Sequence, residues 1–326
     1  LRGYRYWALV CGGLSGSAAS VLLLFAVSPF RPSLPRRDTG LMALLGFGAN
    51  VTAFDIVNYF HRNLDRLLIG RVWGAEAVGL YSRAYALLMF PIQAIRNPLN
   101  AVAFPAMSKL QHQPVAFRMY YRRLCFLVAF LSMPLSAFLL VLSRPVIHLV
   151  LGSHWDGAVP VFSSLAFVAF VQPAITLWGI VSLSSGMSRR YLTLGVLNTA
   201  FSVSGMALGL PWGAVGVATG YAVATYLSAY PLLALAFRGT AVRMGDFALA
   251  ATRPALASAT SAAVCGTAFK YLLAGQADNL QVLIGLSVYA PLYLATLYWL
   301  PGGRLELERT VKTVQVLLRG RGSLQV

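Results

Sequence analysis

The segment LCFLVAFLSMPLSAFLLVLS, residues 124–143, carries no charged side chain along its whole length. A helix needs roughly 20 apolar residues to cross the hydrocarbon core of a bilayer, so this segment predicts a transmembrane helix. The same pattern recurs at 5–28, 41–60, 78–105, 157–184, 191–209, 212–237, 247–273 and 280–300. The sequence therefore predicts an all-α polytopic membrane protein with about nine transmembrane helices.

The composition supports this class. Hydrophobic residues make up 58% of the 326 positions, charged residues make up 11%, and the mean hydropathy is +0.69. A soluble domain carries roughly 25% charged residues, which form its polar surface. The chain has less than half of that share, and this excludes a water-soluble globular protein.

The charge is strongly basic, with 26 lysine and arginine residues against 9 acidic ones. In a soluble protein this excess would suggest a nucleic-acid partner. Here the basic residues lie mostly between the apolar segments, which is typical of membrane topology signals. We therefore expect membrane lipids as their partners, and no nucleic acid.

The distribution of these charges predicts an orientation. If the C-terminus lies inside, the cytoplasmic segments are 29–40, 106–123, 185–190, 238–246 and 301–326, and they hold more than half of all lysines and arginines. Cytoplasmic loops are enriched in lysine and arginine. The sequence thus predicts a multi-pass protein of the bacterial cytoplasmic (inner) membrane with a cytoplasmic C-terminus.

Few residues suggest catalysis or metal binding. Cys11, Cys125 and Cys265 lie far apart in apolar segments, which argues against a disulfide framework or a zinc site. His148 and His154 lie near a helix end, where we expect them at the membrane interface rather than in catalysis. No metal, nucleophile or phosphate-loop motif is present. We expect no enzyme activity, no cofactor and no metal.

Two polar stripes interrupt the apolar segments. Asp55, Asn58, Tyr59, Arg62 and Arg66 recur at steps of three and four and share one helix face, as do Gln93, Arg96, Asn97 and Asn100. Charged side chains at membrane depth normally face a cavity or a partner. Facing stripes with an excess of arginine predict a cationic, water-accessible chamber. Alternatively the groups only pair, Asp55 with Arg62, while Asp65 and Arg66 are plain helix-end charges.

Glycines four residues apart recur in three places, at Gly12 and Gly16, Gly205 and Gly209, and Gly216 and Gly220. Small residues at this spacing let helix backbones approach closely in lipid. The pairs therefore predict a tightly packed helix bundle.

Several runs of the chain resemble a known family. They are GYRYWALVCGGLSGSAASVLLLFAVSPFRPSL at 3–34, the stretch at 44–91 with Asn63, Asp65, Arg66, Gly70, Gly74 and GLYSRAY (79–85), AVAFPAMSKL (101–110), PVIHLVLGSHW (145–155) and GAVGVATG (213–220). In order and spacing these resemble the bacterial polysaccharide transporters. That family contains the lipopolysaccharide and exopolysaccharide flippases of the multidrug/oligosaccharidyl-lipid/polysaccharide exporter superfamily.

The resemblance implies a two-lobed flippase fold around a central cavity. The chain would hold the last helices of such a protein, as a C-terminal fragment with the second lobe and part of the first. Residues 1–28 would be the last helix of the N-terminal lobe and 41–237 the core helices of the C-terminal lobe. Residues 247–300 would form two C-terminal helices, and 301–326 a basic cytoplasmic tail.

The resemblance also implies a function. The expected activity is translocation of an undecaprenyl-diphosphate-linked oligosaccharide across the cytoplasmic membrane by alternating access. The polysaccharide polymerase and export machinery would be further partners. In this reading Arg62, Arg66 and Arg96 contact the diphosphate, Tyr59, Asn97 and Asn100 meet sugar hydroxyls, and Asp55 is a counter-ion or coupling-ion site.

Two alternatives from other classes remain. A multidrug antiporter of the same superfamily would need acidic residues in its cavity, and among the spans predicted here only Asp55 qualifies. A membrane-embedded polysaccharide polymerase or glycosyltransferase is disfavoured by the short loops of this chain.

Overall fold

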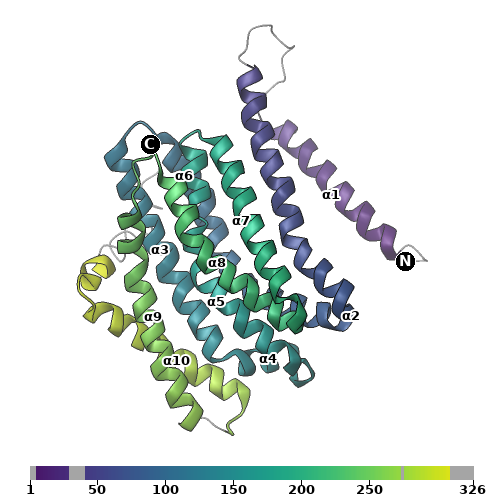
Figure 1. Ribbon diagram of the computed structural model, residues 1–326, viewed down its shortest axis with the longest axis vertical. Helices are drawn as coiled ribbons and strands as arrows, with labels where there is room; N and C mark the ends of the chain where they lie inside the picture. The colour runs from purple at the N-terminus through teal and green to yellow at the C-terminus, as the bar shows by residue number, and fades with distance from the viewer. Residues whose placement is uncertain (1–4, 29–40, 273–274, 309–326) are drawn as a thin grey trace. The chain divides into compact units, whose positions relative to one another are not determined.

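The computed structural model describes residues 5–28, 41–272 and 275–308, without the side chains of residues 5–9, 41–44, 61, 62 and 272. The described residues form helices and turns and contain no strand (Figure 1). The chain divides into two units, Leu1–Leu45 and Gly46–Val326. Each unit is considered by itself below.

The first unit holds α1 (Arg5–Val27). The hydroxyls of Ser15, Ser17 and Ser20 each donate to a backbone carbonyl three or four residues earlier, at 2.9 to 3.2 Å. These bonds satisfy the hydroxyls within the helix, so α1 can lie in hydrocarbon without water.

The other helices follow in chain order. They are α2 (Leu41–Lys109), α3 (Pro114–Val141), α4 (Ser143–Leu151), α5 (Val159–Ile175), α6 (Trp178–Ser184), α7 (Ser188–Gly209), α8 (Gly213–Phe237), α9 (Met244–Leu272) and α10 (Asp278–Trp299), with 3-10 helices η1 (Ser153–Ala158) and η2 (Leu210–Trp212). Because α2 is two helices and α5 and α6 form one interrupted span, the described residues contain nine long helices besides α4. The predicted all-α fold with about nine helices is confirmed.

Five stretches of the described residues are long and apolar enough to cross a membrane. They are Val10–Val27, Pro114–Val141, Ser153–Ser184, Ser188–Phe237, which covers both α7 and α8, and Asp278–Trp299. These stretches support the multi-pass membrane class.

A sharp turn at Gly74 divides α2. Gly74 has φ 81° and ψ −177°, a backbone conformation that residues with a side chain rarely adopt. The chain reverses there: a Cβ built on Gly70 would lie 3.2 Å from the Val78 side chain, and Arg66 lies over the ring of Tyr85. The two halves of α2 therefore form an antiparallel hairpin.

The prediction that the second span ends at residue 60 is wrong, because the helix continues to Trp73 before the Gly74 turn. Within this continuation Asp65 is buried and Arg66 is half-buried. Asp65 is only 4% exposed, nine residues before the turn. Asp65 is therefore not a plain helix-end charge.

α7 and α8 form a second antiparallel hairpin, joined by η2. Gly205 and Gly209 of α7 face Gly220 and Gly216 of α8, so closely that an added Cβ on any of the four would lie 2.0 to 2.4 Å from a carbonyl oxygen across the interface. The close approach predicted from these two glycine pairs is confirmed.

The core of the second unit lies where α3 packs between α5 and α9, and α5 also packs against α8. Tyr121 and Cys125 of α3 and Phe162 and Leu165 of α5 are fully buried there. Cys125 and Cys265 are buried free thiols and Cys11 is an exposed one, as expected for small apolar helix residues.

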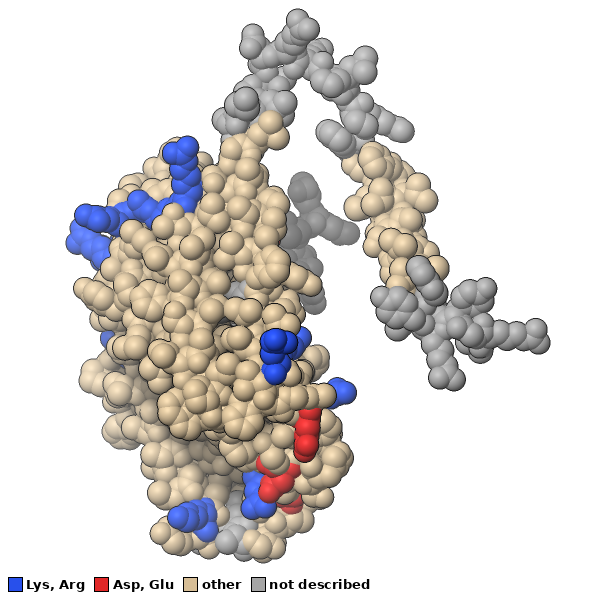
Figure 2. Space-filling view, turned by 45° about the vertical axis from the view of Figure 1, so that its right-hand side comes forward, with Lys and Arg blue, Asp and Glu red and all other residues tan. Residues whose placement is uncertain are grey.

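The second unit has two chemically different ends. At one end, which we call the arginine end, Arg118 Nε of α3 lies 2.7 Å from Asp246 Oδ2 of α9, and Arg190 of α7 donates to the Arg238 carbonyl after α8. On the face in Figure 2, the upper end in that view carries a cluster of lysine and arginine only, and carboxylates show only toward the lower end.

At the opposite end, which we call the histidine end, Trp73 Nε1 donates to the Leu210 carbonyl at 2.8 Å and His148 lies beside Asp278. The segments predicted to lie on one side of the membrane thus gather at one end of the unit. The predicted alternation of loops agrees with the described helices.

Candidate functional site

A cavity of about 310 Å³ lies within the second unit, between both halves of α2 and helices α5 to α8. Its lining is mostly polar or aromatic. The polar and aromatic residues are Phe54, Asp55, Asn58, Asp65, Tyr85, Gln93, Arg96, Gln172, Thr176, Trp178, Tyr191, Asn198 and Tyr221. Such a group of polar side chains between apolar helices marks a candidate binding site.

The cavity runs from the middle of the bundle toward the arginine end. On α2, Asp65 lies nine residues before the turn at Gly74 and Asp55 lies nineteen before it. At 1.5 Å per residue these positions are roughly 13 and 28 Å from the histidine end. Tyr191, near the start of α7, lines the part next to the arginine end.

Local helix geometry places the α2 side chains. Asp55, Asn58 and Asp65 are separated by three and seven residues, so they share one face of the first half. Tyr85, Gln93 and Arg96 share one face of the second half, at steps of eight and three. The hairpin at Gly74 turns these two faces toward each other across the cavity.

The span of α5 and α6 is interrupted where it meets the cavity. α5 ends at Ile175, two residues after Pro173, and α6 begins at Trp178. The Thr176 hydroxyl donates to the Pro173 carbonyl at 3.2 Å, which satisfies one freed acceptor. An interrupted helix is tolerated at membrane depth where it lines a cavity.

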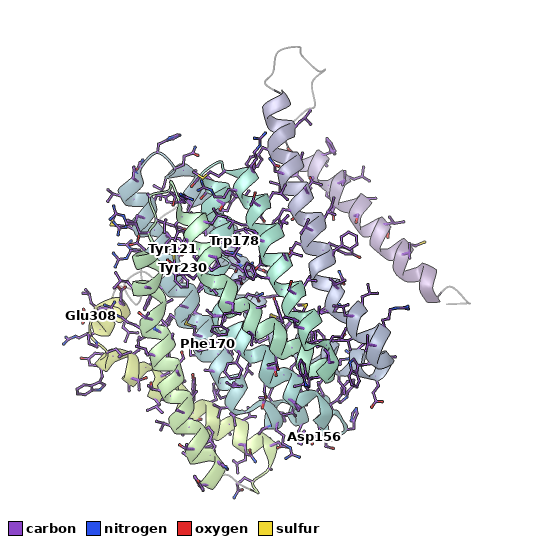
Figure 3. The ribbon with its side chains drawn as sticks, in the orientation of Figure 1. Tyr121, Asp156, Phe170, Trp178, Tyr230 and Glu308 are labelled. Carbon is purple, nitrogen blue, oxygen red and sulfur yellow. The ribbon has the colours of Figure 1, made fainter. Side chains whose placement is uncertain are left out.

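Aromatic rings form one wall of the cavity. The rings of Phe54 and Tyr191 lie 3.9 Å apart between centroids, and Trp178 lies 5.8 Å from Tyr191 and 6.1 Å from Phe54. Trp178 lies within the bundle, in contrast to Asp156 at the lower end of the view in Figure 3. Nearby, Gln172 Nε2 donates to the Tyr221 hydroxyl at 2.5 Å. Ring faces beside amide and hydroxyl groups suit a sugar, which has both C–H faces and hydroxyls.

The lining holds a different ratio of acidic to basic side chains from the one that the sequence predicted. Two carboxylates, Asp55 and Asp65, and one guanidinium, Arg96, line the cavity among the described side chains. Arg66 adds a second guanidinium one side chain away, with its carbon 6.0 Å from the centroid of the Tyr85 ring. The described lining therefore lacks the arginine excess of the predicted cationic chamber.

Asp65 and Arg66 stand out by their burial. The Asp65 carboxylate accepts a hydrogen bond from the Arg66 backbone amide at 2.7 Å. The Tyr81 hydroxyl faces this carboxylate without a hydrogen bond of good geometry, and Arg66 Nε is buried with no hydrogen-bond partner among the described residues. Polar groups buried in this way are costly unless a partner satisfies them, and this favours a site that awaits one.

The predicted site residues take different positions. Asp55 and Arg96 line the cavity, and Arg66 reaches it through Tyr85. Three of the other predicted residues are absent from the lining: Tyr59 is 67% exposed, Asn97 is exposed and Asn100 is half-buried. The side chain of Arg62 lies outside the described part of the chain. The roles of all seven residues stay predictions.

Sequence reasoning missed the part of the lining that comes from later helices. Gln172, Thr176 and Asn198 are polar residues inside apolar spans, so each could have been noted from the sequence. Trp178, Tyr191 and Tyr221 give no such signal, because aromatic residues are common throughout these spans.

Comparisons with known proteins agree with this fold. The family model described as polysaccharide biosynthesis protein matches residues 1–160. The lipopolysaccharide biosynthesis protein WzxC of Escherichia coli is 28% identical over 67% of this chain and 46% of that protein. The teichuronic acid biosynthesis protein TuaB of Bacillus subtilis is 33% identical over 45% of this chain and 30% of that protein.

A solved structure has the same fold. The lipid II flippase MurJ in an inward closed conformation matches 90% of this chain and 62% of its own, with a TM-score of 0.65 and 14% sequence identity. At this identity the likeness concerns the fold alone. The matches span less than half the length of the two curated relatives.

Proposed function

The chain belongs to the polysaccharide transporters of the multidrug/oligosaccharidyl-lipid/polysaccharide exporter superfamily, and from this membership we propose that it forms part of a flippase for lipid-linked oligosaccharides. The substrate is an undecaprenyl-diphosphate-linked oligosaccharide that passes from the cytoplasmic to the periplasmic leaflet for surface polysaccharide synthesis. The protein moves its substrate and makes or breaks no covalent bond in it.

The polar cavity carries this proposal. Its aromatic wall of Phe54, Trp178 and Tyr191 and its amides from Gln172 and Asn198 provide the two kinds of contact that a sugar accepts. The cavity extends toward the arginine end, which the positive-inside pattern assigns to the cytoplasm. A substrate made on the cytoplasmic side would enter from that end.

The diphosphate requires cationic donors once it leaves the headgroup region. Arg96 in the lining and Arg66 beside it are the described candidates, and Arg62 lies one turn from Arg66 on the same helix. Asp55 and Asp65 would act as counter-ions in the empty site, or as the site of a coupling ion. Alternating access of two lobes would then carry the headgroup across.

The carboxylates keep the multidrug antiporter as a second candidate. A drug exporter for lipophilic cations needs acidic cavity residues, and the structure adds Asp65 to the Asp55 that sequence alone suggested. Family membership and the polar, amide-rich lining favour the oligosaccharide.

The deciding experiment is a deletion of the gene that encodes this chain, with analysis of lipid-linked intermediates. We expect surface polysaccharide to be lost and lipid-linked repeat units to accumulate on the cytoplasmic side, both restored by the intact gene. Intact surface polysaccharide without such accumulation would overturn the flippase and favour the antiporter. In that case sensitivity to lipophilic cations should rise.

A further inference from the structure

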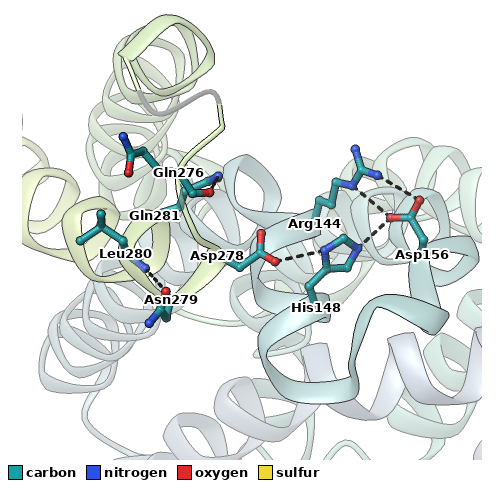
Figure 4. Close-up of polar contacts among 8 residues, drawn as sticks. All are labelled: Arg144, His148, Asp156, Gln276, Asp278, Asn279, Leu280 and Gln281. Carbon is teal, nitrogen blue, oxygen red and sulfur yellow. Dashed lines mark hydrogen bonds and ion pairs between the residues drawn. The ribbon is translucent and has the colours of Figure 1, made fainter.

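A second charged cluster lies at the histidine end, away from the cavity (Figure 4). His148 of α4 stands between two carboxylates. Its Nε2 lies 2.9 Å from Asp156 Oδ1 of η1, and its Nδ1 lies 3.2 Å from Asp278 Oδ2 at the start of α10. Three elements separated in sequence thus meet on one imidazole ring.

The chemistry of the ring makes this arrangement depend on a proton. A neutral imidazole has one N–H donor and one lone pair, whereas the imidazolium has two donors. Carboxylates accept and do not donate unless protonated. Both contacts of His148 are therefore hydrogen bonds only when the ring carries the second proton.

The charge balance leads to the same requirement. Among the described residues, Asp156 and Asp278 are the charged groups that contact His148, and Arg144 forms the next shell. Arg144 lies one turn before His148 on α4 and donates its Nε and Nη2 to Asp156 at 3.1 and 3.2 Å. The cluster carries one uncompensated negative charge when His148 is neutral, and none when it is protonated.

The two carboxylates respond differently to loss of this proton. Asp156 keeps its two hydrogen bonds from Arg144. Asp278 has no other ion-pair partner among the described residues. Deprotonation therefore weakens the link between α4 and α10 more than the link between α4 and η1.

Aqueous protons can reach the cluster. The side chain of His148 is 15% exposed, while those of Asp156 and Asp278 are 52% and 40% exposed. Further along α10 the packing onto α3 is apolar or neutral, with Tyr289 beside Phe138 and the Tyr293 hydroxyl donating to the Phe130 carbonyl at 3.1 Å. Only the start of α10 thus depends on ionic contacts of this cluster.

We propose that His148, Asp156 and Asp278 form a proton-binding site that fastens the start of α10 to α4 and η1. With the proton bound, the imidazolium bridges both carboxylates and α10 is held. Without it, the Asp278 contact is lost and the first turn of α10 opens more often. This site is separate from the cavity, and the proposal does not depend on the flippase function.

Hydrogen exchange of the backbone amides in residues 278–283 tests the proposal, at about pH 5.5 and pH 8 on either side of the usual histidine pKa. After correction for intrinsic exchange rates, we expect about twofold to threefold faster exchange at the higher pH, as for the loss of one exposed ion pair. His148→Gln should abolish this pH dependence. His154→Gln is the matched control, because His154 is an exposed histidine that contacts the ring of Trp155 and forms no ion pair with the described residues. This variant should behave as the unmodified protein.

A second variant guards against a folding defect in His148→Gln. Asp278→Asn keeps the shape of the side chain and leaves the pair of Arg144 and Asp156 intact. It should show fast exchange in residues 278–283 at both pH values. Equal exchange of the unmodified protein at the two pH values, or an unchanged pH dependence in both variants, would overturn the proposal.

Discussion

A Cβ built on Gly209 of α7 would lie 2.0 Å from the carbonyl oxygen of Gly216 on α8. The two backbones are thus in direct contact, and only glycine fits at this point. α7 contributes Tyr191 and Asn198 to the cavity, and α8 contributes Tyr221. The glycine contact therefore sets the separation of two cavity walls.

The first prediction concerns this contact. Gly209→Ala should force the helices apart, because neither backbone can move without repacking, and overpacking of this kind costs about 1–3 kcal/mol. Thermal unfolding in detergent should show a lower midpoint. Gly79→Ala is the control, since a Cβ there has no neighbour within 4 Å. Equal midpoints for the two variants would contradict the close contact.

The second prediction concerns Arg96, the guanidinium in the cavity lining. Arg96→Gln removes the charge that we assign to the diphosphate but keeps a polar side chain. Loss of one charge-assisted hydrogen bond, at about 1.5–3 kcal/mol, should lower export of lipid-linked oligosaccharide roughly tenfold or more. The measurement is surface polysaccharide in cells that carry the variant at matched membrane protein levels.

Arg83→Gln provides the control for Arg96. Arg83 lies on the same half of α2, is exposed, and is absent from the cavity lining. Export should be nearly unchanged in this variant. Similar losses in both variants would mean that the charge of the helix matters rather than the site.

The third prediction separates the two carboxylates of the cavity. Asp65→Asn keeps an oxygen that can accept the Arg66 amide hydrogen bond, so the protein should still fold, while export should fall because the negative charge is gone. Asp55 is exposed, whereas Asp65 is buried. Asp55→Asn should therefore lower the free energy of unfolding less than Asp65→Ala does. Export assays combined with membrane protein levels distinguish loss of transport from loss of folding.

The fourth prediction concerns acid at the histidine end. The Asp156 carboxylate accepts two hydrogen bonds from Arg144 and lies 2.9 Å from His148 Nε2. These ion pairs stabilise the folded protein while the carboxylate is charged, and their contribution is lost when acid protonates it. The unmodified protein should therefore unfold at a higher temperature than Asp156→Asn near pH 5. The difference should shrink as the pH is lowered below about 3.8. A difference that stays constant would contradict the ion pair.

The fifth prediction concerns orientation. In a chain with Cys11 replaced by alanine, Asn279→Cys at the histidine end should react with a membrane-impermeant thiol reagent in intact cells. Arg238→Cys at the arginine end should react only after the membrane is opened. Both positions are exposed, and the remaining Cys125 and Cys265 are buried. The reverse labelling pattern would place the arginine end outside.

Much of the fold could be predicted from sequence because membrane helices depend on a local property. Each must be apolar for the thickness of the bilayer, and the 124–143 segment shows this without reference to the rest of the chain. Boundaries were less certain where charged residues lie inside a helix. Pro114–Val141 begins ten residues before the predicted span, and the second span runs to Trp73.

The candidate site was only partly predictable. The stripe of Asp55 and the stripe of Arg96 are visible because polar residues at helical spacing stand out in apolar segments. Asn97 and Tyr59 belong to the same stripes by spacing but do not line the cavity, since helix rotation is fixed by packing and not by periodicity.

By itself the sequence determined that the chain is a helical membrane protein. It also predicted which helix ends lie on the same side of the membrane and which residues of α2 are candidates for a polar site. Only the tertiary structure brought Gln172, Trp178, Asn198 and Tyr221 to the same cavity and joined His148 to Asp278 across 130 residues. Apolarity and helical period are carried by neighbouring residues along the chain. The meeting of distant side chains depends on how whole helices pack, and contacts such as Gly209 on Gly216 decide that packing.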